Sequence, residues 1–218
     1  MGILRFIQKV KPVLTSSTSR PQVELVEKSE ATTSDFCFNE STSDILLNMN
    51  NILHFIITGG TIDSYYDPIS GNTLPNVHST IPLFIPILKL YENCKYTEVF
   101  MKDSRDIKLT DRKKLLKATK QSKAQKIIIT HGSYTIAETA KYLKQNLEKN
   151  SKVIVLVCSM IPLTGIAPTD AGFNLGYAVA KTQDLNSGIY VCINGRVFMP
   201  EEVTKILAEG RFDSIYKK

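Results

Sequence analysis

From residue 52 onward, short apolar segments alternate with segments of helical pattern. The run at residues 152–157 is apolar at every position after Lys152, so a strand here is buried on both faces. Such strands belong to parallel sheets whose two faces are covered by helices. The sequence therefore predicts an α/β fold, a three-layer doubly wound domain with a mostly parallel sheet and right-handed crossovers.

The expected elements occupy residues 51–218, which we interpret as one domain. The expected strands are 52–58, 96–101, 126–130, 152–157 and 188–193. The expected helices are 109–122, 135–148, 172–182 and 200–208. Pro200 suits the first turn of the last helix, and Gly210 suits its end.

Residues 1–50 have a different character, polar and rich in Ser and Thr, without lasting periodicity. This composition predicts a disordered or loosely attached extension. The first twenty residues contain four basic side chains and no acidic one, a bias that resembles an organelle transit peptide. An ordinary basic tail is the alternative. We expect a cytoplasmic protein, or a mitochondrial one if residues 1–20 direct it there.

The composition narrows the classes of partner and cofactor. The formal charge is +6, and lysines recur every third residue from Lys114 to Lys123, on one face of an expected helix. A solvated face explains them, because a nucleic-acid surface would need interleaved aromatic side chains. No apolar run approaches the roughly 18 residues that cross a membrane. The four cysteines have no paired spacing, which indicates reduced, buried thiols and no metal site. We expect no cofactor.

Two expected strands end in glycine followed by a hydroxyl residue. Thr61 follows two glycines after the first strand, and Ser133 follows Gly132 after the strand at 126–130. The carboxyl edge of a parallel sheet is where ligands bind, so these hydroxyls suggest a site that activates an oxygen nucleophile. A tight turn is the alternative for Thr61. The polar loop at 63–71, with Gly and Pro, is typical of a flap that excludes water.

Other polar groups stand near the same edge. Ser104 and Arg105 follow the second strand and could hold a carboxylate, or else form a solvent-facing approach to the next helix. Thr135 is expected to cap a helix, with Glu138 completing a capping box.

Three segments in this order resemble the N-terminal domain of the bacterial-type L-asparaginase/glutaminase family. They are Thr58–Ile62, His131–Thr135 and Asp170–Leu175, and the resemblance covers about residues 52–211. It implies hydrolysis of a side-chain amide, of asparagine or a related small molecule, through a Thr-linked acyl-enzyme. It also implies a homo-oligomer. We expect no nucleic-acid partner and no membrane association.

The resemblance assigns roles to individual residues. Thr61 matches the nucleophile, Ser133 stands at the second hydroxyl, and Lys181 is the candidate for the catalytic lysine. The residues that it implies for substrate binding are Gly60, Ser104, Arg105, Gly132, Tyr134 and Ser159. Ser104 would hold the α-carboxylate of the substrate, and an amide near Gly60 would stabilise the oxyanion.

The departures from the family leave a second function open. Tyr134 replaces an Asp that contacts the α-ammonium of the substrate, and the expected domain ends at Lys218 without the family's smaller C-terminal domain. A catalytically silent small-molecule-binding domain on the same scaffold is therefore the alternative to an amidohydrolase. Ammonia release from a panel of amides would separate the two.

Overall fold

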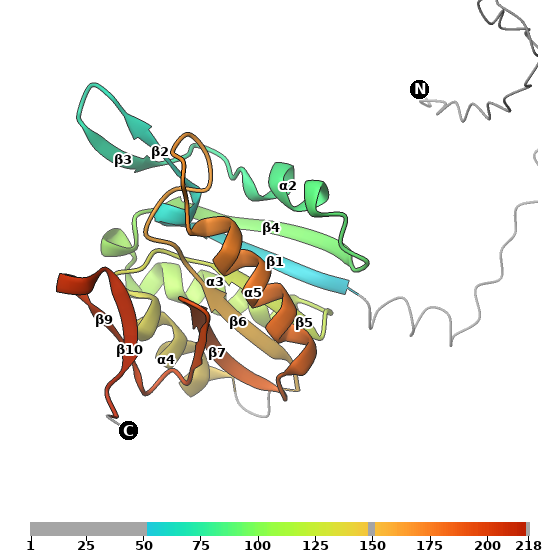
Figure 1. Ribbon diagram of the computed structural model, residues 1–218. Coiled ribbons are helices and arrows are strands. Elements are labelled where there is room, and N and C mark those ends of the chain that lie inside the picture. Colours follow the sequence, from blue (N-terminus) through green and yellow to red (C-terminus); the bar gives the residue numbers. More distant parts are fainter. Residues whose placement is uncertain (1–51, 148–150, 217–218) are drawn as a thin grey trace, which may run out of the picture. The chain divides into compact units, whose positions relative to one another are not determined.

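The computed structural model describes residues 52–147 and 151–216 (Figure 1). The extension expected at residues 1–50 lies outside the described residues.

A six-stranded sheet forms the centre of the domain, in the order β4-β1-β5-β6-β7-β8. Its neighbouring strands are parallel, except that β8 runs antiparallel to β7. The strands are β1 (Ile52–Gly59), β4 (Asn93–Lys102), β5 (Lys126–Thr130), β6 (Val153–Val157), β7 (Gly188–Ile193) and β8 (Arg196–Phe198). The mostly parallel sheet confirms the predicted fold class, and the order places the carboxyl end of β1 between those of β4 and β5.

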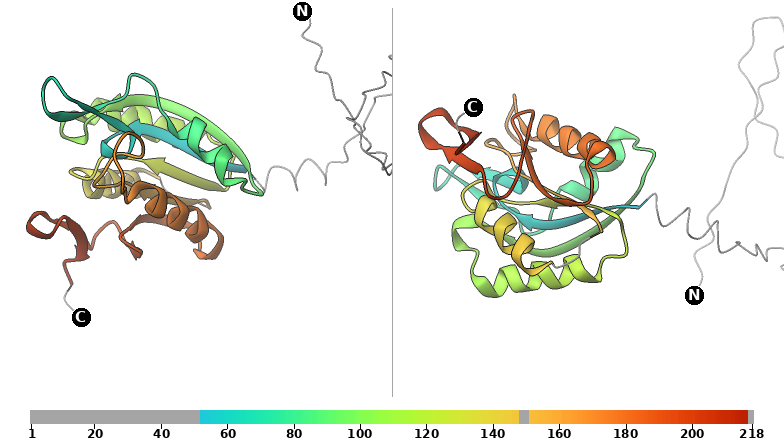
Figure 2. Two further views of the ribbon diagram at one scale, coloured as in Figure 1. Left: turned by 45° about the horizontal axis from the view of Figure 1, so that its top comes forward. Right: turned by 90° about the horizontal axis from the view of Figure 1, so that it is seen from below.

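Helices cover both faces of this sheet, as the right-hand view of Figure 2 shows. The helices α3 (Leu109–Gln121) and α4 (Ile136–Asn146) lie on one face. The helices α5 (Ala171–Asp184) and α2 (Ile81–Phe84) lie on the other. Each face has its own buried cluster, because side chains of one strand point alternately to the two sides.

The prediction of a helix at 200–208 is wrong. Residues Val203–Ile206 form strand β9, which pairs antiparallel with β10 (Arg211–Ser214). Val203, Thr204 and Ile206 are β-branched, a composition that favours an extended chain. The short 3-10 turn η4 (Leu207–Glu209) joins the two strands, and Gly210 ends it with φ 59°.

The expected flap is a short hairpin, β2 (Ser64–Asp67) and β3 (Asn72–Pro75). Its base is fixed by Asp63, which is fully buried in the turn η1 (Thr61–Asp63). The Oδ1 atom of Asp63 accepts hydrogen bonds from Asn76 Nδ2 at 3.1 Å, Thr80 N at 2.9 Å and Thr80 Oγ1 at 3.0 Å. Two further 3-10 turns are η2 (Ile85–Leu88) and η3 (Ser104–Asp106).

Cys158 and Cys192 are free and buried, as expected, whereas Cys94 is free but only partly buried. Cys37 lies outside the described residues. Within the described ranges, no helix has the length and apolar character that crossing a membrane requires.

Candidate active site

Three loops meet at the carboxyl edge of the sheet, after β1, β4 and β5. A Cβ atom on Gly60 would lie 2.3 Å from the Cα of Gly132, and one on Gly132 would lie 2.6 Å from Ser104 Oγ. Gly60 also has φ 81°, a conformation that other residues rarely adopt. Glycine is therefore required for these loops to approach, and the approach brings Thr61, Ser133 and Ser104 to one place.

The two strand-end hydroxyls differ in exposure. Thr61 is half-buried at the start of η1, whereas Ser133 is 3% exposed. Behind them, Thr58 Oγ1 donates to the carbonyl of Thr130 at 2.7 Å, which ties the ends of β1 and β5 together. The hydroxyls thus sit on neighbouring loops of a braced sheet edge, with Thr61 the more accessible.

Lys205, in β9, supplies a cation to this edge. Its Nζ donates a hydrogen bond to Ser133 Oγ at 2.7 Å and lies 4.0 Å from the centroid of the Tyr134 ring. Burial lowers the pKa of Lys205, and Arg105 lowers it further, against opposing effects of Cys158 and Asp103. A lysine of lowered pKa that contacts a serine hydroxyl can take up or return a proton there.

Lys181 does not make the contact expected of it. Its Nζ pairs with Asp184 at 3.1 Å. The residue lies ten positions into α5, about 15 Å along a helix with a rise of 1.5 Å per residue. The end of α5 is at the opposite edge of the sheet, because Gln183 contacts Lys126, the first residue of β5. The structure therefore brings Lys205, not Lys181, to Ser133.

A relay of side chains holds the strand that carries Lys205. Asn174 Nδ2 donates to Asp170, and its Oδ1 accepts the N–H of Asn194 at 3.1 Å. Asn194 Oδ1 in turn accepts the N–H of Phe212 at 3.0 Å. Phe212 stands directly opposite Lys205 in the β9–β10 ladder. Contacts from α5 and from the turn between β7 and β8 thus fix the strand that carries Lys205.

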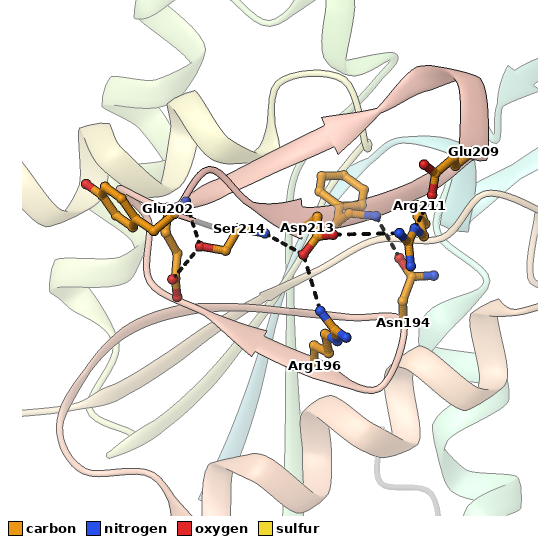
Figure 3. A network of polar contacts seen from close by, with 9 residues as sticks. Asn194, Arg196, Glu202, Glu209, Arg211, Asp213 and Ser214 are labelled. Carbon is orange, nitrogen blue, oxygen red and sulfur yellow. Dashed lines mark hydrogen bonds and ion pairs between the residues drawn. The ribbon is translucent and has the colours of Figure 1, made fainter. Parts of the chain in front are cut away.

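Charged groups reinforce the same hairpin (Figure 3). Arg196 in β8 pairs with Asp213 at 3.2 Å, and Arg211 pairs with Glu209. Ser214 Oγ donates to Glu202 at 2.9 Å. These groups are largely exposed, so each ion pair contributes little to stability.

Other expected site residues have local partners. Ser104 is buried, and its Oγ accepts the N–H of Tyr134 at 3.2 Å. Ser159 Oγ donates to the carbonyl of Ile161 at 2.6 Å, which closes the loop after β6. The N–H of Gly60 donates to the carbonyl of Lys102 at 2.8 Å, so this amide is not available to an oxyanion.

The prediction of a capping box at Thr135 is wrong. Thr135 Oγ1 donates to the carbonyl of Ser104 at 2.7 Å and makes no cap hydrogen bond. Glu138 pairs instead with Arg112 at 3.4 Å. The Thr135 hydroxyl therefore joins the loop after β5 to the loop after β4.

Tyr134 and Arg105 lie side by side at the mouth of the site. The Tyr134 ring is 50% exposed, and the guanidinium of Arg105 lies 5.1 Å from its centroid. Asp103 holds that guanidinium with two hydrogen bonds, to Nε at 3.0 Å and to Nη2 at 2.7 Å.

A cavity of about 600 Å³ opens beside these groups. Its wall comprises residues 72–75, residues 101–103, Arg105 and Asp106. No group of His, Cys, Asp and Glu side chains suited to a metal ion occurs in residues 52–147 or 151–216.

The family model for the N-terminal domain of asparaginase matches residues 52–216. The chain belongs to the asparaginase family. The three segments that suggested this from the sequence all lie within the matched range, and the match includes the β9–β10 hairpin.

Relatives within the asparaginase family are similar over part of their length. L-asparaginase 2 of Escherichia coli (strain K12) is 34% identical over 160 residues, which is 69% of this chain and 45% of that protein. The glutaminase-asparaginase of Acinetobacter glutaminasificans is 39% identical over 82 residues, 36% of this chain and 24% of that protein. The chain therefore spans less than half the length of these curated relatives.

Solved asparaginase structures have the same fold. The thermostable L-asparaginase from Thermococcus kodakarensis matches with a TM-score of 0.66 and 25% identity, over 77% of this chain and 52% of that one. A probable cytoplasmic L-asparaginase from Campylobacter jejuni matches with a TM-score of 0.58 and 26% identity, over 75% and 51%.

Lys205 contacts the candidate site, but the sequence did not predict it as a site residue. The helix expected at 200–208 obscured it, because that helix has no reason to approach Ser133. The signal that could have found it is local: three β-branched residues surround Lys205 within Val203–Ile206. Read as a strand, this segment could pair with residues 211–214 and return a lysine to the sheet edge.

Proposed function

We propose that the protein is an asparaginase-like amidohydrolase that cleaves a side-chain amide through a Thr61-linked acyl-enzyme. The observation that carries this proposal is the 2.7 Å hydrogen bond from Lys205 Nζ to Ser133 Oγ, beside the loop of Thr61. In this assignment Lys205 takes the role that the sequence analysis gave to Lys181. The family membership and the paired strand-end hydroxyls support the same reaction class.

The difference in exposure supports Thr61 as the nucleophile. Thr61 is half-buried, so a substrate can reach its hydroxyl, whereas Ser133 is buried and already engaged by Lys205. A threonine hydroxyl needs a base to become nucleophilic at neutral pH. The lowered pKa of Lys205 increases the fraction of neutral amine that can act as this base through Ser133.

The reaction then has two steps. Thr61 Oγ forms a bond to the amide carbon, the C–N bond breaks, and ammonia leaves with the proton of the threonine hydroxyl. Water next cleaves the ester, which releases a carboxylic acid and returns the proton to Thr61. Ser133 and Lys205 carry protons in both steps, and no cofactor is consumed.

Ammonia release from purified full chain tests this proposal. The panel contains asparagine, glutamine, their deaminated analogues and N-substituted amides. We expect Thr61→Ala to reduce the accepted activity at least about hundredfold, and Thr61→Ser to retain a measurable part of it. Mass spectrometry of the quenched reaction should detect an acyl group on the peptide that contains Thr61. Undiminished activity of Thr61→Ala on every accepted substrate would refute the mechanism.

A silent binding domain is the second candidate, and Tyr134 favours it. Its half-exposed aromatic ring stands where the resemblance implies an acidic contact to substrate. Loss of a charge-assisted hydrogen bond costs about 1.5–3 kcal/mol, enough to weaken the family reaction severely. Absence of ammonia from the whole panel, together with calorimetric binding of a panel member, would favour this candidate.

A further inference from the structure

Two cations converge on the Tyr134 ring at the mouth of the site. Lys205 Nζ lies 4.0 Å and Arg105 Cζ 5.1 Å from the ring centroid, both within the range of cation–π attraction. Lys205 Nζ also donates a hydrogen bond to Ser133 Oγ and is a cation in its protonated form, whereas Arg105 is charged at every working pH.

The neighbouring carboxylates have other partners or face solvent, so they do not cancel the positive charge near the Tyr134 ring. Asp103 is held by Arg105 through two hydrogen bonds and so has its charge matched. Asp170 points to the N–H groups of Met160 and Ile161, and Asp63 to the base of the hairpin. Asp106, on the cavity wall, is exposed to solvent.

An ammonium group is therefore disfavoured next to Tyr134. An aromatic face alone would attract an ammonium, but this ring already has two cations on it. A third positive charge would be placed beside Lys205 and Arg105 while the Asp103 carboxylate is already bound by Arg105, and like charges so placed oppose binding. A carboxylate at the same position would be attracted to protonated Lys205, and more weakly to Arg105, which is already paired with Asp103.

We propose that the site selects monoamides of short dicarboxylic acids, which carry a carboxylate and no α-ammonium, over the corresponding amino-acid amides. The proposal rests on the proposed function for its hydrolytic part. The observations that carry it are the two cations on the Tyr134 ring and the engagement of Asp103 by Arg105.

Matched substrate pairs test the charge preference. Succinamate and asparagine differ by one α-ammonium, and so do glutaramate and glutamine. With the full chain at pH 7, we expect kcat/KM for ammonia release to be at least about tenfold higher for the deaminated member of a pair. Equal rates, or a preference for asparagine and glutamine, would overturn the proposal.

Two variants of Tyr134 connect the preference to the ring. Tyr134→Asp supplies a carboxylate that can receive an ammonium, so the succinamate-to-asparagine ratio should fall by about tenfold or more. Tyr134→Phe keeps the ring and its two cations, so the same ratio should stay close to that of the unmodified chain. A ratio that is unaffected by Tyr134→Asp would contradict the assignment.

Binding of the products separates this proposal from the proposed function. Calorimetry with succinate and aspartate measures the same charge preference without turnover. At least about tenfold tighter binding of succinate, without ammonia from any amide, would support the preference and refute the hydrolase. Equal binding of the two, or binding of neither in a chain that also hydrolyses no amide, would overturn the preference.

Discussion

Lys205 lies directly opposite Phe212 in the β9–β10 ladder, and Phe212 is anchored on both its side-chain and backbone atoms. The phenyl ring is buried in the core, and the backbone N–H donates to Asn194 Oδ1 at 3.0 Å. The reach of Lys205 to Ser133 therefore depends on a residue that never touches the site.

The first prediction compares two lysines. We expect Lys205→Met to lower kcat for ammonia release about hundredfold or more, because it removes the group that moves a proton through Ser133. Lys181→Met removes a charge that pairs with Asp184 at the far edge of the sheet, so its kcat should stay within about twofold. Steady-state assays on the preferred amide measure both, with thermal unfolding as the check on folding. The reverse order of effects would return the role to Lys181.

A second prediction concerns the relay that holds the hairpin. Asn194 has φ 54°, which glycine adopts freely, so Asn194→Gly removes the acceptor of the Phe212 N–H without backbone strain. We expect a loss of about 1–3 kcal/mol in the free energy of unfolding. We also expect a fall of about tenfold or more in kcat, because a small displacement of Lys205 disrupts its contact with Ser133.

The control for this prediction lies in the same hairpin. Arg196→Met breaks the exposed ion pair with Asp213, which contributes about 0–1 kcal/mol. Urea unfolding and kcat measured on both variants should separate them clearly. Similar losses in the two variants would show that the whole hairpin, rather than the relay, sets the position of Lys205.

A third prediction tests the contact between loops. Gly132→Ala would place a Cβ atom 2.6 Å from Ser104 Oγ, so the loops after β4 and β5 must separate. We expect a loss of about 1–3 kcal/mol in stability together with loss of activity. Gly176→Ala, in α5, meets no atom within 4 Å and should stabilise the chain by about 0.5–1 kcal/mol. Chemical denaturation gives both values, and a neutral Gly132→Ala would contradict the close approach.

The fourth prediction is a loss of stability in acid. Burial lowers the pKa of His54 to about 4, with Lys95 and Lys152 adding to the shift. Burial likewise lowers the pKa of His131 to about 4. Since both folded pKa values lie below the usual 6.5, the unfolded chain binds protons first as the pH falls. Stability is therefore complete above about pH 6.5 and is lost progressively towards pH 4, by at most about 3 kcal/mol per histidine.

Urea midpoints at pH 7.5, 6 and 5 measure this dependence. His54 contacts Ser122 Oγ at 2.7 Å and Thr97 Oγ1 at 2.8 Å, polar partners that an amide side chain can also satisfy. His54→Gln should therefore fold and show a weaker dependence on pH over this range. An unchanged dependence would assign the effect to other groups.

The parallel sheet could be predicted because its strands are apolar on both faces. The runs ending at Thr58, Thr130 and Val157 have no other stable location than the middle of three layers. Thr61 and Ser133 could be predicted as site residues for the same reason, because each directly follows a glycine just after a buried strand.

The hairpin that carries Lys205 could not be predicted in the same way. Glu201, Glu202 and Leu207 are good helix formers, so local propensity opposed the extended chain. The strand is determined by tertiary contacts, with Val203 and Phe212 buried in the core and Glu202 bonded to Ser214. Ser133 and Lys205 are 72 residues apart in sequence, so no local pattern connects them.

That separation also has a consequence for synthesis of the chain. A polypeptide emerging from the ribosome can assemble β1, β4, β5 and β6 before residues 203–214 have been translated. These strands and Thr61 are therefore synthesised before Lys205. A nascent chain is thus expected to lack the proposed proton carrier of the site until the β9–β10 hairpin has left the ribosome.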